Sequence, residues 1–292
     1  MRSAIVNLNK PRGITSQQAV SRVKRILRVK KAGHCGTLDP EASGVLLVCV
    51  GRATRLADYF QALPKTYRAV LKLGETTDTQ DASGTVVETR GTSSVHEADV
   101  TAVLQGFVGQ IEQIPPMYSA LKSEGRPLYK LARKGIEIER RPRSVQIYKM
   151  EVVSVELPLV TFDVQCSKGT YIRTLCHDAG EKLGTGGHML SLVRTAVGDF
   201  TIENAADIDH LDEQDLIAAG HALSFMTECR VLEPASSRIR NGVPAPPDQC
   251  TFSRSPAANE PFRLHTEEGL FVGVGSFRNG VVKVECLIAP EV

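Results

Sequence analysis

The chain has 292 residues, of which 42% are hydrophobic and 23% are charged, and its formal net charge is +2. This composition is ordinary for one large or two modest globular domains that bury a core, so it excludes a mainly disordered chain. The longest apolar run, Val45–Val50, is far shorter than the roughly 20 residues of a membrane helix, and MRSAIVNLNKPRG at the N-terminus lacks the apolar core of a secretory signal. We therefore expect a soluble, cytoplasmic protein with no membrane partner.

The cysteine pattern argues against structural disulfides and against a structural zinc site. Seven cysteines occur at irregular spacings, and no two of them form a CxxC pair. An odd number without paired spacing is untypical of a disulfide framework or a zinc ribbon. We expect reduced, mostly buried thiols and no metal site.

The N-terminal third is predicted to mix strands and helices. Thr15 and Gln18 have the spacing of a capping box, and apolar residues follow at helical period, which predicts a helix over residues 16–29. The apolar run at 45–50 is typical of a strand buried on both faces. Further patterns predict strands at 4–8, 66–73 and 84–90 and helices at 53–63 and 94–107, the last capped by Ser94 with Glu97.

The rest of the chain is predicted to continue the sheet and then to change character. Residues 114–143 have weak periodicity and many charges, and we interpret them as a long excursion that clamps a ligand. Two alternating stretches around Pro158 predict a hairpin, and KGTYIRTLCHDAGEKLG predicts a helix with Arg173 in its first turn, off the apolar stripe. After about residue 230 short strands are separated by Pro, Asn and Gly. We predict an α+β fold with a largely antiparallel sheet over residues 1–230, and a small β domain over residues 231–292.

Charge is distributed unevenly along this nearly neutral chain. Residues 10–35 contain eight basic residues and no acidic one, and residues 114–149 contain nine basic and three acidic residues. By contrast, residues 201–233 contain eight acidic residues and one basic residue. Two cationic segments on such a chain are typical of a surface that holds a polyanion, although each segment alone is equally consistent with a solvated helix face.

A single carboxylate follows a glycine turn in AGHCGTLDPEASGVLLVCVG, residues 32–51. Gly33 and Gly36 allow backbone conformations that are closed to other residues, and Pro40 prevents a helix from continuing. Asp39 is therefore expected on a rigid turn beside a buried strand. From spacing alone, such a carboxylate either caps local backbone or does chemistry.

The same stretch resembles the catalytic motif of the TruB family of tRNA pseudouridine synthases, commonly GHxGTLDPxAxGxL. Further stretches match the family in the same order, from about residue 5 to residue 205: NKPRGITS, KTYRAVLKLGETTDTQDASG, IPPMYSALKSEGRPLYKLARKG, SKGTYIRTLCHDAGEKLG and LSLVRTAVGDF. The resemblance implies the pseudouridine synthase fold and a PUA-like C-terminal domain, with SSRIRNGVPAP as its most similar part. It also implies that Asp39 is the catalytic aspartate, Tyr67 the active-site tyrosine and Arg173 the ionic partner of Asp39. Without the resemblance, Tyr67 fits a core position and Arg173 a helix surface.

The chemistry that the family performs needs these residue types. Conversion of uridine to pseudouridine breaks the N1–C1′ bond, rotates the uracil and rejoins it through C5, so it needs no redox change and no cofactor. An ionised aspartate serves either as a nucleophile at C1′ or by promoting removal of the C2′ proton, and the sequence leaves both routes open. An arginine beside the carboxylate favours its charged form against the opposing effect of burial. Tyr67 is expected to stack on the base or to move a proton.

The remaining candidates are expected to bind the RNA. A base within an RNA fold must be extruded before a buried aspartate reaches its sugar, and the resemblance assigns His34 to that step. A core histidine or a metal ligand is the alternative for His34. Leu192 is expected to form an apolar wall of the pocket, and Asp81 either to hold displaced nucleotides or to make an Asx turn. The cationic segments are expected to contact RNA phosphates, and such contacts weaken as the salt concentration rises. We assign these contacts to Lys10, Lys122 and Lys130.

The sequence therefore predicts a cofactor-free pseudouridine synthase that modifies the T-loop uridine at tRNA position 55, as a monomer without an obligatory protein partner. A guide-RNA-dependent synthase with a similar core is one alternative. An RNA-binding or tRNA-folding protein is another. A glycoside hydrolase would need a second catalytic carboxylate, and none accompanies Asp39 in these motifs.

Overall fold

The computed structural model describes residues 3–288 apart from 120, 124 and 133. For residues 122, 123, 126, 127, 129 and 130 it describes the backbone but not the side chains. The helices are α1 (Ser16–Ile26), α2 (Ala57–Ala62), α3 (Glu97–Gln105), α4 (Leu128–Ala132), α5 (Ile172–Lys182), α6 (Ala219–Ala222) and α7 (Ala235–Ile239). Short 3-10 segments are η1 (Gly51–Leu56), η2 (Ile202–Asn204), η3 (Glu213–Asp215) and η4 (Pro247–Gln249).

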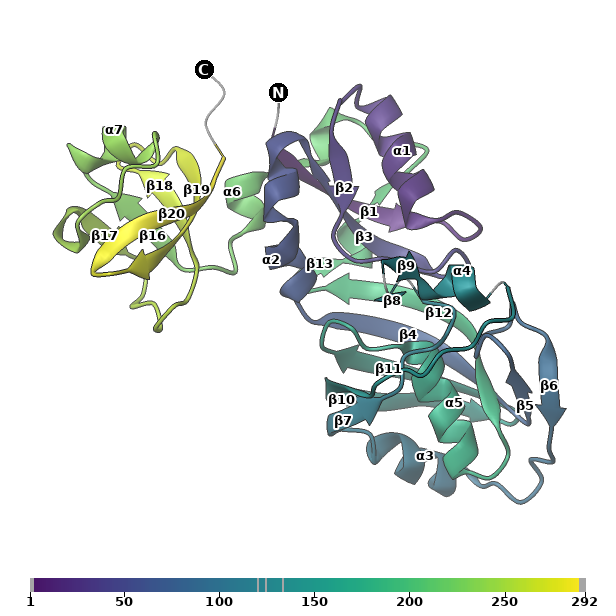
Figure 1. Ribbon diagram of the computed structural model, residues 1–292. Coiled ribbons are helices and arrows are strands. Elements are labelled where there is room, and N and C mark those ends of the chain that lie inside the picture. Colours follow the sequence, from purple (N-terminus) through teal and green to yellow (C-terminus); the bar gives the residue numbers. More distant parts are fainter. Residues whose placement is uncertain (1–2, 120, 124, 133, 289–292) are drawn as a thin grey trace.

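An 11-stranded sheet forms the larger part of the molecule (Figure 1). Its main path, in the order of hydrogen bonding, is β14 (Ala206–Asp207), β1 (Ala4–Lys10), β3 (Ser43–Val50), β12 (Gly187–Val197), β4 (Lys65–Leu73), β11 (Leu159–Cys166), β10 (Arg143–Glu156) and β7 (Gly109–Gln113). Beside this path, β13 (Phe200–Thr201) pairs with β12, β15 (Leu216–Ala218) with β1, and β2 (Ala32–His34) with β3. The pairs β1–β14 and β3–β12 are parallel, and the other pairs described in this sheet are antiparallel. The predicted α+β class with a largely antiparallel sheet is confirmed.

Strand β3 is buried on both sides of the sheet. Leu46 and Val48 belong to a core that also contains buried residues of α1, α3 and α5. Val45 and Leu47 point the other way, into a second core with residues of α2 and α6. Successive side chains of a strand face opposite sides, so two covered faces require an uninterrupted apolar run. The sequence of β3 has that property.

Helix α1 begins as predicted and ends earlier. Thr15 accepts a hydrogen bond from the backbone N–H of Gln18, and the Gln18 side chain accepts one from the backbone of Thr15. The helix ends at Ile26 rather than near residue 29, because Arg28 adopts a φ of 51° that a right-handed helix excludes.

Two other helix predictions need correction. The helix expected over 53–63 is the 3-10 segment η1 followed by the short helix α2. Helix α3 is capped by His96, whose backbone N–H donates to the Asp99 carboxylate, and not by Ser94 with Glu97. The capping signals lie so close together that a shift of two positions was not apparent from the sequence.

Two small hairpins extend from the main sheet. The first pairs β5 (Glu75–Thr77) with β6 (Val86–Thr89), and its turn carries Asp81. The second pairs β8 (Lys122–Ser123) with β9 (Arg126–Pro127) and lies with α4 inside the predicted excursion. The base of the excursion is closed where Gln113 of β7 pairs with Arg143 of β10.

The C-terminal part forms a separate five-stranded sheet (Figure 1). Its strands, in order, are β17 (Cys250–Phe252), β16 (Glu228–Val231), β18 (Phe262–Thr266), β19 (Phe271–Arg278) and β20 (Val281–Leu287). This sheet has its own apolar core but also contacts the main part, because Val274 and Cys286 pack into the core beside α2 and α6. Arg55 of η1 donates to the carbonyl of Leu287 at 2.8 Å. No helix among the described residues is long and apolar enough to cross a membrane.

Candidate active site

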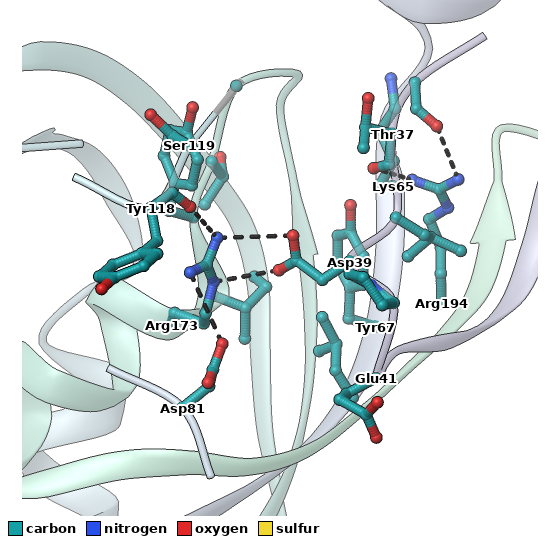
Figure 2. Close-up of a pocket in the computed structure, with 18 of the residues that line it drawn as sticks. Thr37, Asp39, Glu41, Lys65, Tyr67, Asp81, Tyr118, Ser119, Arg173 and Arg194 are labelled. Carbon is teal, nitrogen blue, oxygen red and sulfur yellow. Dashed lines mark hydrogen bonds and ion pairs between the residues drawn. The ribbon is translucent and has the colours of Figure 1, made fainter. Parts of the chain in front are cut away.

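A cavity of about 980 Å³ lies where several segments from different parts of the chain converge. Five of the predicted residues line it: Asp39, Tyr67, Asp81, Arg173 and Leu192. They come from the loop before β3, from β4, from the β5–β6 turn, from α5 and from β12, respectively. Figure 2 shows how four of them, with Leu192 not labelled, lie toward one another.

Asp39 and Arg173 form an ion pair at this cavity. Nε of Arg173 lies 3.0 Å from Oδ2 of Asp39, and a second guanidinium nitrogen lies 3.5 Å from Oδ1. The side chain of Arg173 is 6% exposed, whereas that of Asp39 is 37% exposed. Arg173 is therefore not a surface residue of its helix. The carboxylate keeps an open side in the cavity while its other side is held by a buried cation.

Arg173 also joins two other segments of the chain to this pair. Its guanidinium donates to the carbonyl of Thr79 at 3.3 Å and to that of Tyr118 at 2.9 Å. It lies 3.6 Å from Oδ2 of Asp81 (Figure 2). Oδ1 of Asp81 accepts from the backbone N–H of Ser83 at 3.0 Å, which is an Asx turn. Asp81 thus makes the Asx turn, one of the two roles predicted for it, and its Oδ2 faces Arg173.

The loop that carries Asp39 is held by a buried arginine. Arg194 is 1% exposed and donates to the carbonyls of Gly36 at 3.2 Å, Thr37 at 3.4 Å and Val45 at 2.6 Å. Gly36 has a φ of 114°, which a side chain would disfavour, as expected from the glycine turn. Gly33, by contrast, lies within strand β2.

The rest of the loop is held as tightly. The hydroxyl of Ser16, at the start of α1, donates to the carbonyl of Leu38 and accepts from its N–H, both at 2.9 Å. The carbonyl of Asp39 accepts from the N–H of Ala42 at 3.1 Å. Every carbonyl of residues 36–40 therefore accepts at least one hydrogen bond, the last of them from Lys10.

Lys10 does not have the position expected of a phosphate contact. It is 0% exposed, and its ammonium donates to the carbonyls of Pro11 at 2.7 Å, Ile14 at 2.9 Å and Pro40 at 3.3 Å. Burial lowers the pKa of Lys10 to about 8, although Glu41 and Asp39 act in the opposite direction. An ammonium that is enclosed by three carbonyls cannot also reach a phosphate, so the structure corrects this prediction. Lys10 holds the loop instead.

Tyr67 and Leu192 form the sheet side of the cavity. Tyr67 is 9% exposed, and burial raises the pKa of its hydroxyl, so the hydroxyl stays protonated near neutral pH. Leu192, which is 7% exposed, lies on the neighbouring strand opposite Ala69. Both side chains also belong to the core on this face of the sheet. They can present a ring and an apolar wall to a planar ligand.

The other predicted residues are not brought into the cavity by the described structure. His34 lies on β2, half-buried and outside the residues that line the cavity. Burial lowers its pKa, with a smaller effect of Arg194 in the same direction, so its ring is neutral at pH 7. The side chains of Lys122 and Lys130 lie outside the described residues. In the described part of the chain, no group of three His, Cys, Asp or Glu side chains is arranged to hold a metal ion.

Three further residues of the site were not identified from the sequence: Lys65, Tyr171 and Arg194. Lys65 is 6% exposed, and its ammonium donates to the carbonyls of Gln61 and Leu63. Burial lowers its pKa to about 8. Arg194 lies two residues after Leu192 on the same face of β12, so a basic residue at an inward position of an apolar strand was the available signal.

Comparisons with known proteins identify similar sequences along most of the chain. Residues 24–172 match the family model of the TruB family pseudouridylate synthase (N terminal domain), and residues 173–236 match that of the tRNA pseudouridylate synthase B C-terminal domain. The chain is 45% identical over 275 residues to a tRNA pseudouridine synthase B of Clostridium kluyveri, covering 93% of this chain and 94% of that protein. It is 44% identical over 245 residues to one of Geobacter sulfurreducens, covering 81% of each.

Solved structures show the same fold. The chain superposes on a chain of a crystal structure of a Cbf5-Nop10-Gar1 complex with a TM-score of 0.78 and 27% identity, over 98% of this chain and 85% of that one. A second structure, an H/ACA RNP bound to a substrate RNA containing 2′-deoxyuridine, gives a TM-score of 0.76 and 25% identity, over 98% and 85% of the two chains. The similarity spans both sheets, because almost the whole chain is covered.

Proposed function

The chain belongs to the TruB family of pseudouridylate synthases, and we propose that it isomerises the T-loop uridine at tRNA position 55 with Asp39 as the catalytic group. It is an isomerase, and its relatives at 41% to 45% identity carry the name tRNA pseudouridine synthase B. The observation that carries the assignment of Asp39 is its carboxylate, 3.0 Å from a buried arginine yet 37% exposed. That carboxylate is held in one orientation and still reaches a ligand.

The geometry suits the chemistry at C1′. The buried guanidinium of Arg173 holds the carboxylate of Asp39 in one direction, which both routes require. When the N1–C1′ bond breaks, the uracil rotates within the cavity and forms the C5–C1′ bond. One proton then leaves C5 and one joins N1, so the product is an isomer. The protonated hydroxyl of Tyr67 is suited to donate or relay a proton during this exchange.

The RNA is held by exposed cations and its target base is extruded. Arg25, Arg28, Lys30 and Lys31 are exposed at the end of α1 and in the segment after it. They contact phosphates of the T stem-loop, and His34 assists the departure of the uracil from its stack. The enzyme acts as a monomer without a guide RNA or a protein partner. Independence from a guide RNA and from a protein partner is supported by the greater identity of the chain to the relatives named for tRNA, 41% to 45%, than to the Cbf5 complexes, 25% to 27%.

The test uses the protein alone with an unmodified tRNA transcript. Pseudouridine is mapped by primer extension after carbodiimide treatment, and the matched control is Asp39→Asn, whose amide fills the same space but cannot act as nucleophile or base. We expect one stop at the T-loop uridine with the native protein and none with Asp39→Asn, at nearly equal affinity for tRNA. Tight binding without a stop would favour the RNA-folding alternative, a requirement for guide RNA would favour the guided synthase, and release of free uracil would favour a hydrolase.

A further inference from the structure

The excursion over residues 114–143 begins beside the helix that carries the ion-paired arginine. Gln113 is the last residue of β7 and pairs with Arg143 of β10, so these two residues form the base of the excursion. The side chain of Gln113 points inward and is 2% exposed, whereas Arg143 is exposed to solvent. A fully buried amide must find hydrogen-bond partners.

Gln113 finds both partners on the backbone of a single residue. Its Oε1 accepts from the N–H of Tyr171 at 3.0 Å, and its Nε2 donates to the carbonyl of Tyr171 at 3.2 Å. Tyr171 is the residue before α5, with an extended backbone, and no side chain caps the helix there. The amide therefore fixes the backbone where α5 starts, two residues before Arg173. A shift of this backbone moves the guanidinium with it.

The excursion reaches the same arginine a second time. The carbonyl of Tyr118 accepts from Arg173 at 2.9 Å. Near the base of the excursion, Arg140 donates to the carbonyl of Pro115 at 3.1 Å, so its two arms are tied together. Arg173 is thus held by the excursion on one side and by Asp39 on the other.

We infer that Gln113 is a positioning residue for the reaction: it ties the base of the excursion to Arg173, so that the seating of the excursion on RNA sets the geometry of the Arg173–Asp39 pair. The inference rests on the proposed function, and it assigns Gln113 no contact with the substrate. The excursion then has two tasks, to bind RNA and to align the catalytic pair. Loss of the amide removes the second task and leaves the first.

The first experiment replaces Gln113 by methionine, which fills a similar volume and makes neither hydrogen bond. We expect the single-turnover rate of pseudouridine formation to fall by about 10-fold to 100-fold, the range typical of a small misplacement of catalytic groups. The Kd for the tRNA transcript should change by less than about threefold. The matched control is Gln110→Met, on the same strand, where the native side chain is exposed and donates to the hydroxyl of Ser144 at 2.7 Å. This control should leave both quantities unchanged.

A second variant separates positioning from a loss of folding. In Gln113→Glu, a protonated carboxyl offers one donor and one acceptor, as the amide does, whereas an ionised carboxyl only accepts and repels the carbonyl of Tyr171. Burial raises the pKa of the introduced carboxyl, the buried guanidinium of Arg173, two residues after Tyr171, acts in the opposite direction, and the exposed Arg143 across the strand pair is screened by solvent. We expect its rate, relative to the native protein at each pH, to be highest at the lowest pH tested and to fall as the carboxyl ionises with rising pH.

Each outcome decides between the two roles. An unchanged single-turnover rate in Gln113→Met, or a decrease that is matched by an equal decrease of tRNA affinity, overturns the inference. If Gln113→Met does not fold, a ratio for Gln113→Glu that does not vary with pH overturns it. A native protein that makes no pseudouridine is a different result, because it rejects the proposed function and not the role of Gln113.

Discussion

Replacement of Arg173 by methionine is the most direct perturbation of the site. Methionine fills a large part of the volume of the arginine and has no charge. The change removes the cation 3.0 Å from Asp39 and 3.6 Å from Asp81, and it leaves the carbonyls of Thr79 and Tyr118 without this donor. The two carboxylates then face one another across an apolar side chain.

The magnitude follows from the burial of the partners. Removing one member of a buried ion pair costs about 3–5 kcal/mol, because an uncompensated charge remains. The side chain of Asp81 is 15% exposed and that of Asp39 is 37% exposed, so solvent screens Asp39 in part and we expect the lower end, about 3 kcal/mol of unfolding free energy. If the transition state loses a similar stabilisation, the single-turnover rate falls by about 100-fold or more. The Kd for tRNA should change by less than about threefold.

Two measurements and one control test this reasoning. The chain contains no tryptophan, so urea unfolding is followed by circular dichroism. The rate is measured as release of tritium from C5-labelled uridine in tRNA, since the C5–H bond is broken in the reaction. The control is Arg68→Met, which removes a 2.8 Å ion pair with Asp163 whose side chains are 53% and 31% exposed. Such surface pairs contribute about 0–1 kcal/mol, so this control should be nearly neutral.

A double variant sharpens the test of Arg173. If the unpaired charge of Asp39 contributes to the instability, Asp39→Asn added to Arg173→Met should recover part of the unfolding free energy that Arg173→Met loses. The reasoning is refuted if Arg173→Met unfolds at the native urea concentration and keeps the single-turnover rate within about threefold.

Three further outcomes are expected. Lys10→Met removes a buried ammonium from three carbonyls and should lower the unfolding free energy by about 2–3 kcal/mol. It should also lower the single-turnover rate more than it lowers the affinity for tRNA. The control Arg12→Met, at a side chain that is 61% exposed, should leave the unfolding free energy in urea nearly unchanged. The rate should fall as pH rises through about 8, where Lys10 and Lys65 lose their protons. Folding lowers these two pKa values from 10.5, so the contribution of the two lysines to the unfolding free energy rises between about pH 8 and 10.5. The unfolding free energy, measured over the same pH range, should therefore show no decrease from deprotonation of these lysines. Deletion of residues 122–134 removes five basic residues and one acidic residue. The slope of log affinity against log salt concentration should become shallower by up to about 0.9 for each phosphate that these cations neutralise. An unchanged slope would place the phosphate contacts elsewhere.

The parts of the fold that the sequence predicted well depend on local patterns. The capping box of Thr15 with Gln18 and the apolar run of β3 are each contained in one short segment, and both have the expected structure. The glycine turn before Asp39 is equally local, with Gly36 at positive φ. The end of α1 was missed because Arg28 takes a left-handed conformation without the glycine that usually marks one.

The environment of the site depends on contacts between distant segments, and here charge patterns were misleading. Arg194 bonds to the carbonyl of Val45, 149 residues earlier in the chain. The sequence predicts Lys10 among the RNA-binding cations because no local feature distinguishes a buried lysine from an exposed one. Its burial is decided by the carbonyl of Pro40 and by the chain that covers it. Gln113 gave no signal, since its partner is the backbone of a residue in another element.

Two groups of cations therefore have different roles. Lys10 and Arg194 are buried and donate to backbone carbonyls of the loop that carries Asp39, whereas the exposed cations after α1 remain available to phosphates. Because the loop backbone is satisfied by these internal donors, the carboxylate of Asp39 is not needed to hold its own turn. It is paired with Arg173, and in the proposed function it is free to act on the substrate. The energetic cost of holding a charged side chain in one geometry is met during folding, so little reorganisation remains when the uridine arrives.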